Sequence, residues 1–346
     1  MSKSLSSRQA LALAALLVVS ASAKAAEYEV EPILSPTGGV VAPSSIATNG
    51  LVAGEVYGTT ITCFKYLDGV LTTLPLPPNT LRCERAVTDL LGNISMTVVP
   101  TENPNTTRVV ELTTNGQFLS LNGLTVDGNR VVASKGGRMA GSSLSEAGEP
   151  QAYLFNRKGG GVNVGALTGK TRSWLTGLNA KGWAVGYAET AGSRRTQAFR
   201  YKDGKVVWLG ALSEGGSTYV AGINAGWTAV GSSESVADDF MSYRAVTWKG
   251  KSGPVNLGTL FDLFTHGEAI NSTGVVVGRY GLGAAGMRVS NGVMSNLVNL
   301  IPADKKVLWD GLLGRAVAIS DNGMIVGANS RYNGVNGAAY LMRPSP

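Results

Sequence analysis

The 346-residue chain is poor in the side chains that carry most metal and redox chemistry. It has one histidine and two cysteines, which excludes histidine-rich metal centres and most thiol chemistry. Only 15% of its residues are charged, against about a quarter in ordinary domains. Disordered chains are rich in charge and poor in aliphatic residues, so this composition argues against disorder. No stretch after residue 25 reaches the roughly 20 apolar residues of a membrane helix. Neither a G-x-S-x-G nucleophile elbow nor an Asp-x-Asp-x-Asp-Gly calcium loop occurs.

Glycine, by contrast, is abundant, with 46 residues in the chain. Each glycine inside a helix costs about 1 kcal/mol, so this content excludes long helical bundles. Hydrophobic residues make up 44% of the chain, which is enough to build a core. The composition therefore favours a β protein rich in turns.

The N-terminus has the pattern of a secretory signal peptide. Lys3 and Arg8 precede a short apolar run at residues 10–19, and small-x-small cleavage patterns end at Ala23 and at Ala25. Residues 1–25 are therefore predicted to be removed, with cleavage after Ala23 or Ala25, and the protein to be secreted or periplasmic. Removing Lys3, Arg8 and Lys24 lowers the formal net charge from +7 to +4. That mild charge and the absence of a basic run argue against nucleic acid as a partner.

Cys63 and Cys83 are the only cysteines, and 20 residues separate them. In an oxidising compartment such a pair can form a disulfide. Two buried free thiols are the alternative, and the sequence leaves both open.

One phrase recurs along the chain: an apolar residue, three polar or turn residues, a glycine, a short apolar strand and a final glycine. Its copies end at Gly54, Met96, Gly141, Gly186, Gly231, Gly278 and Gly327, and the copy that ends at Met96 is degenerate. The spacing of 42 to 49 residues is that of a propeller blade. A second pattern follows each phrase, with a small residue, an aromatic or apolar residue and a glycine-bearing turn, as at residues 198–205.

Each unit therefore holds four short strands joined by Asn-, Asp- and Gly-rich turns, as antiparallel hairpins require. The seventh unit stops after its third strand, and the segment that starts at Tyr28 has the spacing of the missing fourth. The sequence predicts an all-β fold, a seven-bladed β-propeller of four-stranded antiparallel blades at residues 26–346, with the N-terminal strand closing the last blade. Closure removes two exposed sheet edges.

The units resemble the HAF repeat of probable extracellular proteins of bacteria, whose wording is AF-x-W/Y-x-x-G, LG-x-L and IN-x-x-G-x-V-G. The resemblance covers most of the chain after residue 25 and is strongest at residues 174–283, with its best copy at residues 197–231. The histidine of the motif is absent from every copy and is replaced, for example, by Gln197, Gln151 or Arg244. The resemblance implies an exported, propeller-like repeat protein and no agreed activity.

In such a blade the longer connections gather on one face, and the tight turns lie on the other. Arginine forks suit carboxylate or phosphate, and flat aromatic rings suit sugar faces or peptide side chains. The predicted binding residues on the loop face are Arg172, Trp174, Arg194, Arg195, Arg279, Tyr280, Arg331 and Tyr332. The recurring aromatic residues Phe155, Tyr201 and Trp248 are assigned instead to the core between blades.

These patterns predict a non-catalytic, monomeric binding module whose ligand is an anionic glycan or an envelope or surface protein, with no cofactor and no metal. The first alternative is a propeller glycan hydrolase or lyase that uses paired carboxylates, and the second is a purely structural surface or matrix protein. Candidate acids near the loop face are Glu102, Glu189, Glu234, Asp238, Asp239, Asp262 and Glu268. His266 is expected to be a capping or loop residue just before a strand.

Overall fold

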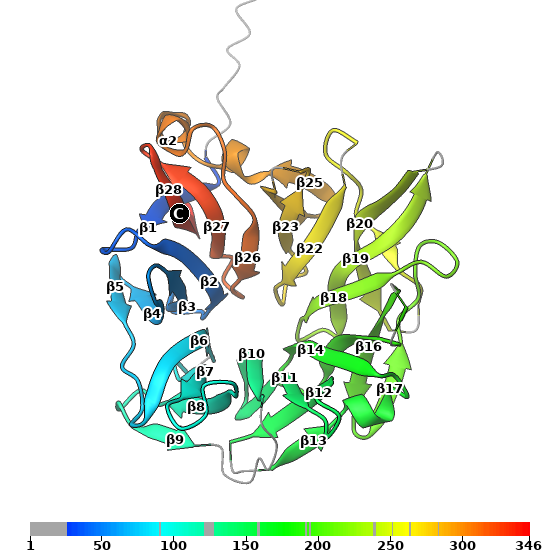
Figure 1. Ribbon diagram of the computed structural model, residues 1–346. Helices are drawn as coiled ribbons and strands as arrows, with labels where there is room; N and C mark the ends of the chain where they lie inside the picture. The colour runs from blue at the N-terminus through cyan, green and yellow to red at the C-terminus, as the bar shows by residue number, and fades with distance from the viewer. Residues whose placement is uncertain are drawn as a thin grey trace, which may run out of the picture.

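A ring of seven four-stranded antiparallel sheets makes up the computed structural model (Figure 1). The structure describes residues 26–89, 91–120, 128–157, 160–190, 192–193, 195–237, 240–250, 252–262, 264–282 and 284–346. The predicted seven-bladed β-propeller is confirmed. The predicted signal peptide at residues 1–25 and the predicted binding residue Arg194 lie outside the described residues.

The first four blades follow one another along the chain. Blade 1 consists of β2 (Val40–Ile46), β3 (Val52–Tyr57), β4 (Ile61–Leu67) and β5 (Val70–Thr73). Blade 2 consists of β6 (Thr80–Thr88), β7 (Ile94–Pro100), β8 (Arg108–Leu112) and β9 (Phe118–Ser120). Blade 3 consists of β10 (Arg130–Lys135), β11 (Arg138–Leu144), β12 (Pro150–Asn156) and β13 (Gly161–Asn163). Blade 4 consists of β14 (Arg172–Leu178), β15 (Ala184–Glu189), β16 (Thr196–Lys202) and β17 (Lys205–Trp208).

The last three blades complete the ring. Blade 5 consists of β18 (Thr218–Ile223), β19 (Thr228–Ala237), β20 (Phe240–Lys249) and β21 (Val255–Asn256). Blade 6 consists of β22 (Thr265–Ile270), β23 (Val276–Tyr280), β24 (Ala285–Ser290) and β25 (Val293–Asn296). Blade 7 consists of β26 (Ala316–Ile319), β27 (Ile325–Tyr332), β28 (Val335–Pro344) and β1 (Tyr28–Ile33). The short helices are η1 (Gly165–Leu167), η2 (Leu297–Leu300), α2 (Ala303–Lys306) and η3 (Val307–Trp309).

Blade 7 is shared between the two ends of the described chain, as the sequence predicts. Strand β1 pairs with β28 from Tyr28↔Pro344 to Ile33↔Ala339, and the two strands lie side by side in Figure 1. Glu27 adds an ion pair to Arg288 of blade 6, with 2.6 Å between Oε2 and Nη2. The leading segment is therefore fixed to two blades and closes the ring.

Each inner strand, the first in its blade, carries a β-bulge, and the bulge explains the repeated glycine. In blade 5 the pairing shifts between Val220 and Gly222, and Val220 lies opposite Gly231. A Cβ atom on Gly231 would overlap the carbonyl oxygen of Tyr219, so only glycine fits there. In blade 2, where Met96 replaces the glycine and lies opposite Ala86, the pairing shifts earlier in the strand, between Thr80 and Arg82 and between Cys83 and Arg85.

The core lies between neighbouring blades. Phe155, Tyr201 and Trp248, which occupy equivalent positions in blades 3 to 5, are all buried as predicted. Side chains also tie the blades together at the tight turns: Asn179 Nδ2 donates to the carbonyl of Asn224 in the next blade, and Asn224 Nδ2 donates to that of Asn271 (both 2.9 Å). The repeated asparagine thus links blades as well as shaping turns.

The strand order places two kinds of connection on opposite faces of the ring. The turns between first and second strands and between third and fourth strands form one face, called the turn face. The connections between second and third strands and between blades form the other, called the loop face. Two of the connections between second and third strands, residues 232–243 and 329–337, belong mostly to the β19–β20 and β27–β28 hairpins. Their residues pair across the hairpin, so these segments are extended strands more than open loops.

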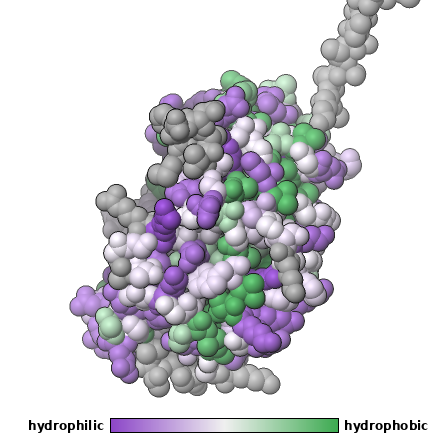
Figure 2. Space-filling view, turned by 90° about the vertical axis from the view of Figure 1, so that its right-hand side faces the viewer, coloured by the Kyte–Doolittle hydropathy of each residue, from purple (hydrophilic) through white to green (hydrophobic). Residues whose placement is uncertain are grey.

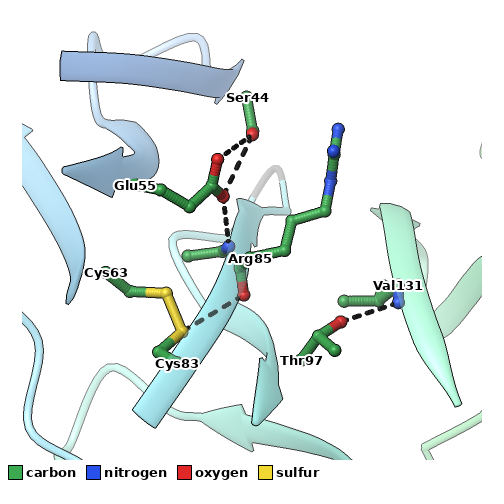
Figure 3. The surroundings of a disulfide bond; sticks show 8 residues. Ser44, Glu55, Cys63, Cys83, Arg85, Thr97 and Val131 are labelled. Atoms are coloured by element: carbon green, nitrogen blue, oxygen red, sulfur yellow. Dashed lines mark hydrogen bonds between the residues drawn. A yellow bond between two sulfur atoms is a disulfide. The ribbon is translucent and has the colours of Figure 1, made fainter. Parts of the chain in front are cut away.

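Cys63 of β4 and Cys83 of β6 form a disulfide with 5.7 Å between their Cα atoms. Both residues are buried, and the bond joins blade 1 to blade 2. Figure 3 shows the side chain of Arg85, two residues along β6, extending away from the disulfide.

Candidate functional site

A hollow of about 590 Å³ opens where the inner strands meet near the loop face. We call it the channel cup. Its lining includes Ser44, Glu55, Arg85, Tyr187, Glu268 and Arg315. These residues come from blades 1, 2, 4, 6 and 7, so only the closed ring brings them together. The volume lies within the range of small-ligand sites.

Two arginines give the channel cup its charge. Arg85 and Arg315 form no ion pair with any carboxylate that the structure describes. Their Nε atoms are buried and have no hydrogen-bond partner among the described residues. Unmet donors beside a hollow are costly unless a ligand or water accepts from them. The pair is therefore suited to an anion.

The acids of the channel cup do not cancel this charge. Glu268 is paired with Arg279, with 3.1 Å between Oε1 and Nε. Glu55 is 3% exposed, and burial raises its pKa against the smaller lowering effect of Arg85. Its carboxylate accepts a hydrogen bond from the backbone N–H of Ala86 (2.9 Å). It accepts another from Ser44 Oγ (3.2 Å), which Figure 3 shows. Among its described residues, the channel cup therefore holds two arginines without an ion-pair partner and one such carboxylate, Glu55.

Aromatic rings form a continuous belt along one side of the same mouth. Ring centroids are 5.1 Å apart for Trp174 and Tyr187, 5.4 Å for Tyr187 and Tyr219, and 6.0 Å for Tyr219 and Tyr243. His266 stacks on Tyr243 at 5.4 Å. The belt crosses blades 4 to 6 and reaches the channel cup through Tyr187. Such rings offer flat apolar contact with polar tips.

His266 lies within β22, not before it as the sequence suggested, and pairs with Arg279 of β23. Burial, and to a smaller extent the charge of Arg279, lowers its pKa from 6.5 to about 4. The imidazole is therefore neutral at pH 7 and serves as one more ring of the belt.

The residues that the sequence predicts as binding residues are distributed over three blades. In blade 4, Trp174 belongs to the aromatic belt, and Arg172 lies 5.4 Å from its ring while pairing with Glu149 (3.1 Å) and Glu189 (3.0 Å). Arg195 lies in the β15–β16 connection and borders a second hollow.

In blades 6 and 7 the predicted binding residues mostly form ion pairs or packing contacts with other residues of the chain. Arg279 pairs with Glu268, and Tyr280 is 7% exposed in a core cluster. Arg331 pairs with Asp310, with 3.3 Å between Nε and Oδ2. Tyr332 packs on Trp309 at 4.8 Å. These contacts leave fewer of the predicted groups open to a ligand than the sequence suggested.

The second hollow, of about 520 Å³, lies over the outer part of blade 4 on the loop face. We call it the blade 4 groove. Its lining includes Lys170, Glu189, Arg195, Gln197, Trp208 and Glu214. Strand β15 separates the two hollows, because Tyr187 borders the channel cup and the next residues, Ala188 and Glu189, border the groove. From the side, the surface of the ring mixes hydrophobic and hydrophilic side chains (Figure 2), so the hollows are the clearer candidates.

The candidate acids have partners of their own. Glu102 pairs with Arg108 (2.8 Å), Glu189 with Arg172 and Glu268 with Arg279. Glu234 accepts from the backbone N–H of Ser217 (2.7 Å) and from the hydroxyl of Tyr243 (3.3 Å). Asp262 is exposed, and Asp238 and Asp239 lie outside the described residues. Among the described residues, no cluster of His, Cys, Asp and Glu could hold a metal ion.

The sequence reasoning missed Arg85 and Arg315 because it looked for binding residues in loops. A usable signal was present in the repeats. At the position just before the residue that pairs with the repeat glycine, or with Met96 in blade 2, the seven copies carry Ala42, Arg85, Arg130, Trp174, Tyr219, His266 and Arg315. The type of side chain varies at this position, while the neighbouring positions keep to the repeat pattern. Such variation indicates residues at the surface around the channel and not in the core.

Comparison with known proteins supports the fold and nothing finer. No family model and no curated protein matches the chain. Among solved structures, "YCF48 bound to D1 peptide" is 13% identical with a TM-score of 0.53. The match covers 91% of this chain and 97% of the chain in that structure. A puromycin hydrolase S511A mutant complexed with PGG is 10% identical with a TM-score of 0.54. That match covers 83% of this chain and 50% of the hydrolase chain.

TolB from Acinetobacter baumannii is 11% identical with a TM-score of 0.45 and covers 85% of this chain. The chain spans 63% of that protein's length. At such identities the likeness concerns the propeller fold alone. Within the described residues, no helix has the length and hydrophobicity to cross a bilayer.

Proposed function

We propose that this protein is an exported, non-catalytic binding module that holds an anionic ligand in the channel cup. The observation that carries the proposal is the pair of open guanidinium groups, Arg85 and Arg315, in the same hollow as Tyr187. Arginine binds carboxylates and phosphates with two parallel hydrogen bonds. The aromatic belt supplies apolar contact beside this charge.

The glycan or envelope protein suggested by the sequence meets the chemistry of this site if it presents a carboxylate or phosphate. A propeller can use its loop face for either, and the similarly folded YCF48 has been solved with a D1 peptide. The rigid inner strands favour binding, because the side chains of the channel cup are held before the ligand arrives.

Export rests on three supports. Residues 1–25 have the pattern of a signal peptide. The Cys63–Cys83 disulfide is typical of oxidising compartments. The HAF-repeat resemblance points to extracellular bacterial proteins. Together they favour a secreted or periplasmic protein.

A thermal-shift titration of the chain lacking residues 1–25 tests the proposal. The probes are acidic oligosaccharides and peptides, each paired with a neutral form, because a ligand that binds only the folded state raises the Tm with concentration. The Arg85→Ala/Arg315→Ala variant should lose the stabilisation by anionic probes. The control, Arg138→Ala/Lys181→Ala, removes the same charge from the turn face and should keep it.

Equal binding by the two variants would contradict the proposal. The same samples distinguish the hydrolase alternative, because a hydrolase releases new reducing ends from a glycan probe and a binding module does not.

A further inference from the structure

The blade 4 groove is a second hollow with its own set of side chains, apart from the channel cup. It combines one exposed aromatic ring, two cations without acidic partners and several side chains that can bind hydroxyl groups. Trp208 ends the outer strand β17 and is 39% exposed. Phe199 packs edge-on against its ring, with 5.8 Å between the centroids, which fixes the plane of the indole.

The cations stand close to this ring. Lys170 Nζ lies 5.7 Å from the centroid of Trp208. Neither Lys170 nor Arg195 forms an ion pair with a carboxylate in the described part of the chain. Gly215 leaves the room that the guanidinium of Arg195 occupies, because a Cβ atom there would lie 2.7 Å from Nη1.

The acids in the lining leave the groove positive. Glu189 is paired with Arg172, so Glu214 is the one acid among the described lining residues with no cation within ion-pair distance. Two open cations face this single carboxylate. A carboxylate also accepts from sugar hydroxyls, as do Gln197, Thr190 and Ser193 at the same border.

The walls of the groove are held in place by the neighbouring blade. The indole N–H of Trp248 donates to the carbonyl of Gly210 (2.8 Å), and the backbone N–H of Leu212 donates to Ser233 Oγ (2.9 Å). Ser217 donates its backbone N–H to Glu234 (2.7 Å). The segment at residues 209–217 is therefore ordered without a ligand, and binding costs little rearrangement.

We infer that the blade 4 groove binds a segment of a carboxylate-bearing polysaccharide, with a uronic acid ring stacked on Trp208. In a hexuronate the carboxylate is bonded directly to the sugar ring, so a ring on the indole carries its charge within reach of Lys170 and Arg195. The polar side chains at the border suit hydroxyl groups spread around one stacked ring. A peptide would instead need several apolar pockets for alternate side chains.

Tetragalacturonate is the test probe, and its fully methyl-esterified form, which has the same shape without charge, is the matched control. Isothermal titration with the chain lacking residues 1–25 should show binding of the acid and about tenfold weaker binding of the ester, the effect of one charge-assisted hydrogen bond. Trp208→Ala and Lys170→Ala/Arg195→Ala should each weaken binding of the acid by about tenfold or more. Trp208→Phe, which keeps a ring, should weaken it less.

The Arg85→Ala/Arg315→Ala variant should bind tetragalacturonate as the parent does, which separates this site from the channel cup. Failure of the parent to bind tetragalacturonate, or equal binding by the groove variants with unchanged Tm, would overturn the inference. Loss of binding in the channel cup variant alone would move the saccharide to that site and also overturn it.

Discussion

Cys63 and Cys83 are bonded at the place where Ala198 and Thr218 are joined by a hydrogen bond three blades further on. Cys63 pairs with Glu55, one residue past the repeat glycine of blade 1, as Ala198 pairs with Tyr187 in blade 4. There the backbone N–H of Ala198 donates to Thr218 Oγ1 (2.8 Å). The same hydrogen bond links Ala152 to Ser173 and Ala245 to Thr265, both at 2.9 Å. The disulfide is thus a covalent form of a contact that other blade interfaces make with a hydroxyl group.

This equivalence predicts a graded effect of removing the disulfide. The Cys63→Ala/Cys83→Ala variant should lose about 3 kcal/mol of unfolding free energy, because a 20-residue loop is no longer closed in the unfolded chain. Cys63→Ala/Cys83→Thr restores the hydroxyl acceptor and should recover about 1 kcal/mol of that loss. Urea unfolding of the three proteins measures the difference.

The control is Cys83→Val in the Cys63→Ala background, which keeps the branched shape of threonine without its hydroxyl. If the valine and threonine variants are equally stable, the hydroxyl makes no hydrogen bond there and the equivalence is only positional.

The number and closure of the blades could be predicted from the sequence because both follow from local signals that repeat. Glycines such as Gly186 and Gly231 recur at a blade period, and the segment at Tyr28 supplies the strand that the last copy lacks. The reason for the glycine could not be predicted. It depends on the carbonyl of Tyr219, which the bulge in β18 brings against Gly231.

Gly231→Ala tests this reason. The added Cβ would overlap the Tyr219 carbonyl, so the bulge must move, at a cost of about 1–3 kcal/mol as for other overpacked cores. Gly253→Ala is the control, because a Cβ at Gly253 meets no atom within 4 Å, and it should leave the Tm unchanged. Thermal unfolding that shows no difference between the two variants would contradict the steric explanation.

The site was harder to predict than the fold because its residues are close only in the closed ring. Arg85, in strand β6, and Arg315, just before β26, lie 230 positions apart, and the sequence suggested no binding role for either. Tyr280, by contrast, has the composition of a binding residue and is buried in the core. Burial and side-chain direction depend on which strands of neighbouring blades meet in the closed ring, and the type of a single residue does not show this.

Glu55 makes the folded protein sensitive to rising pH. Because burial raises its pKa above 4.5, its contribution to stability is full below pH 4.5 and is lost as the pH rises through the raised value. Glu55→Gln keeps an acceptor for Ala86 and Ser44 and cannot ionise. Urea unfolding should show the variant gaining stability over the parent between pH 4.5 and pH 8. A constant difference over this range would show that Glu55 has its ordinary pKa.

His266 makes the folded protein less stable as the pH falls, which is the opposite direction from Glu55. Its pKa is lowered from 6.5 to about 4, chiefly by burial and secondly by Arg279. Stability from the neutral ring is therefore full above pH 6.5 and is lost as the pH falls towards 4. His266→Gln should make unfolding free energy less dependent on pH across this window.

The chain has one histidine, so its imidazole protons can be followed by NMR without assignment. The titration midpoint should fall near pH 4 in the parent. Arg279→Gln should raise it, because a positive charge opposite His266 is removed, yet leave it below 6.5, because burial is the larger cause. A midpoint at 6.5 in the parent would show a solvated ring and would remove His266 from the aromatic belt that borders the channel cup.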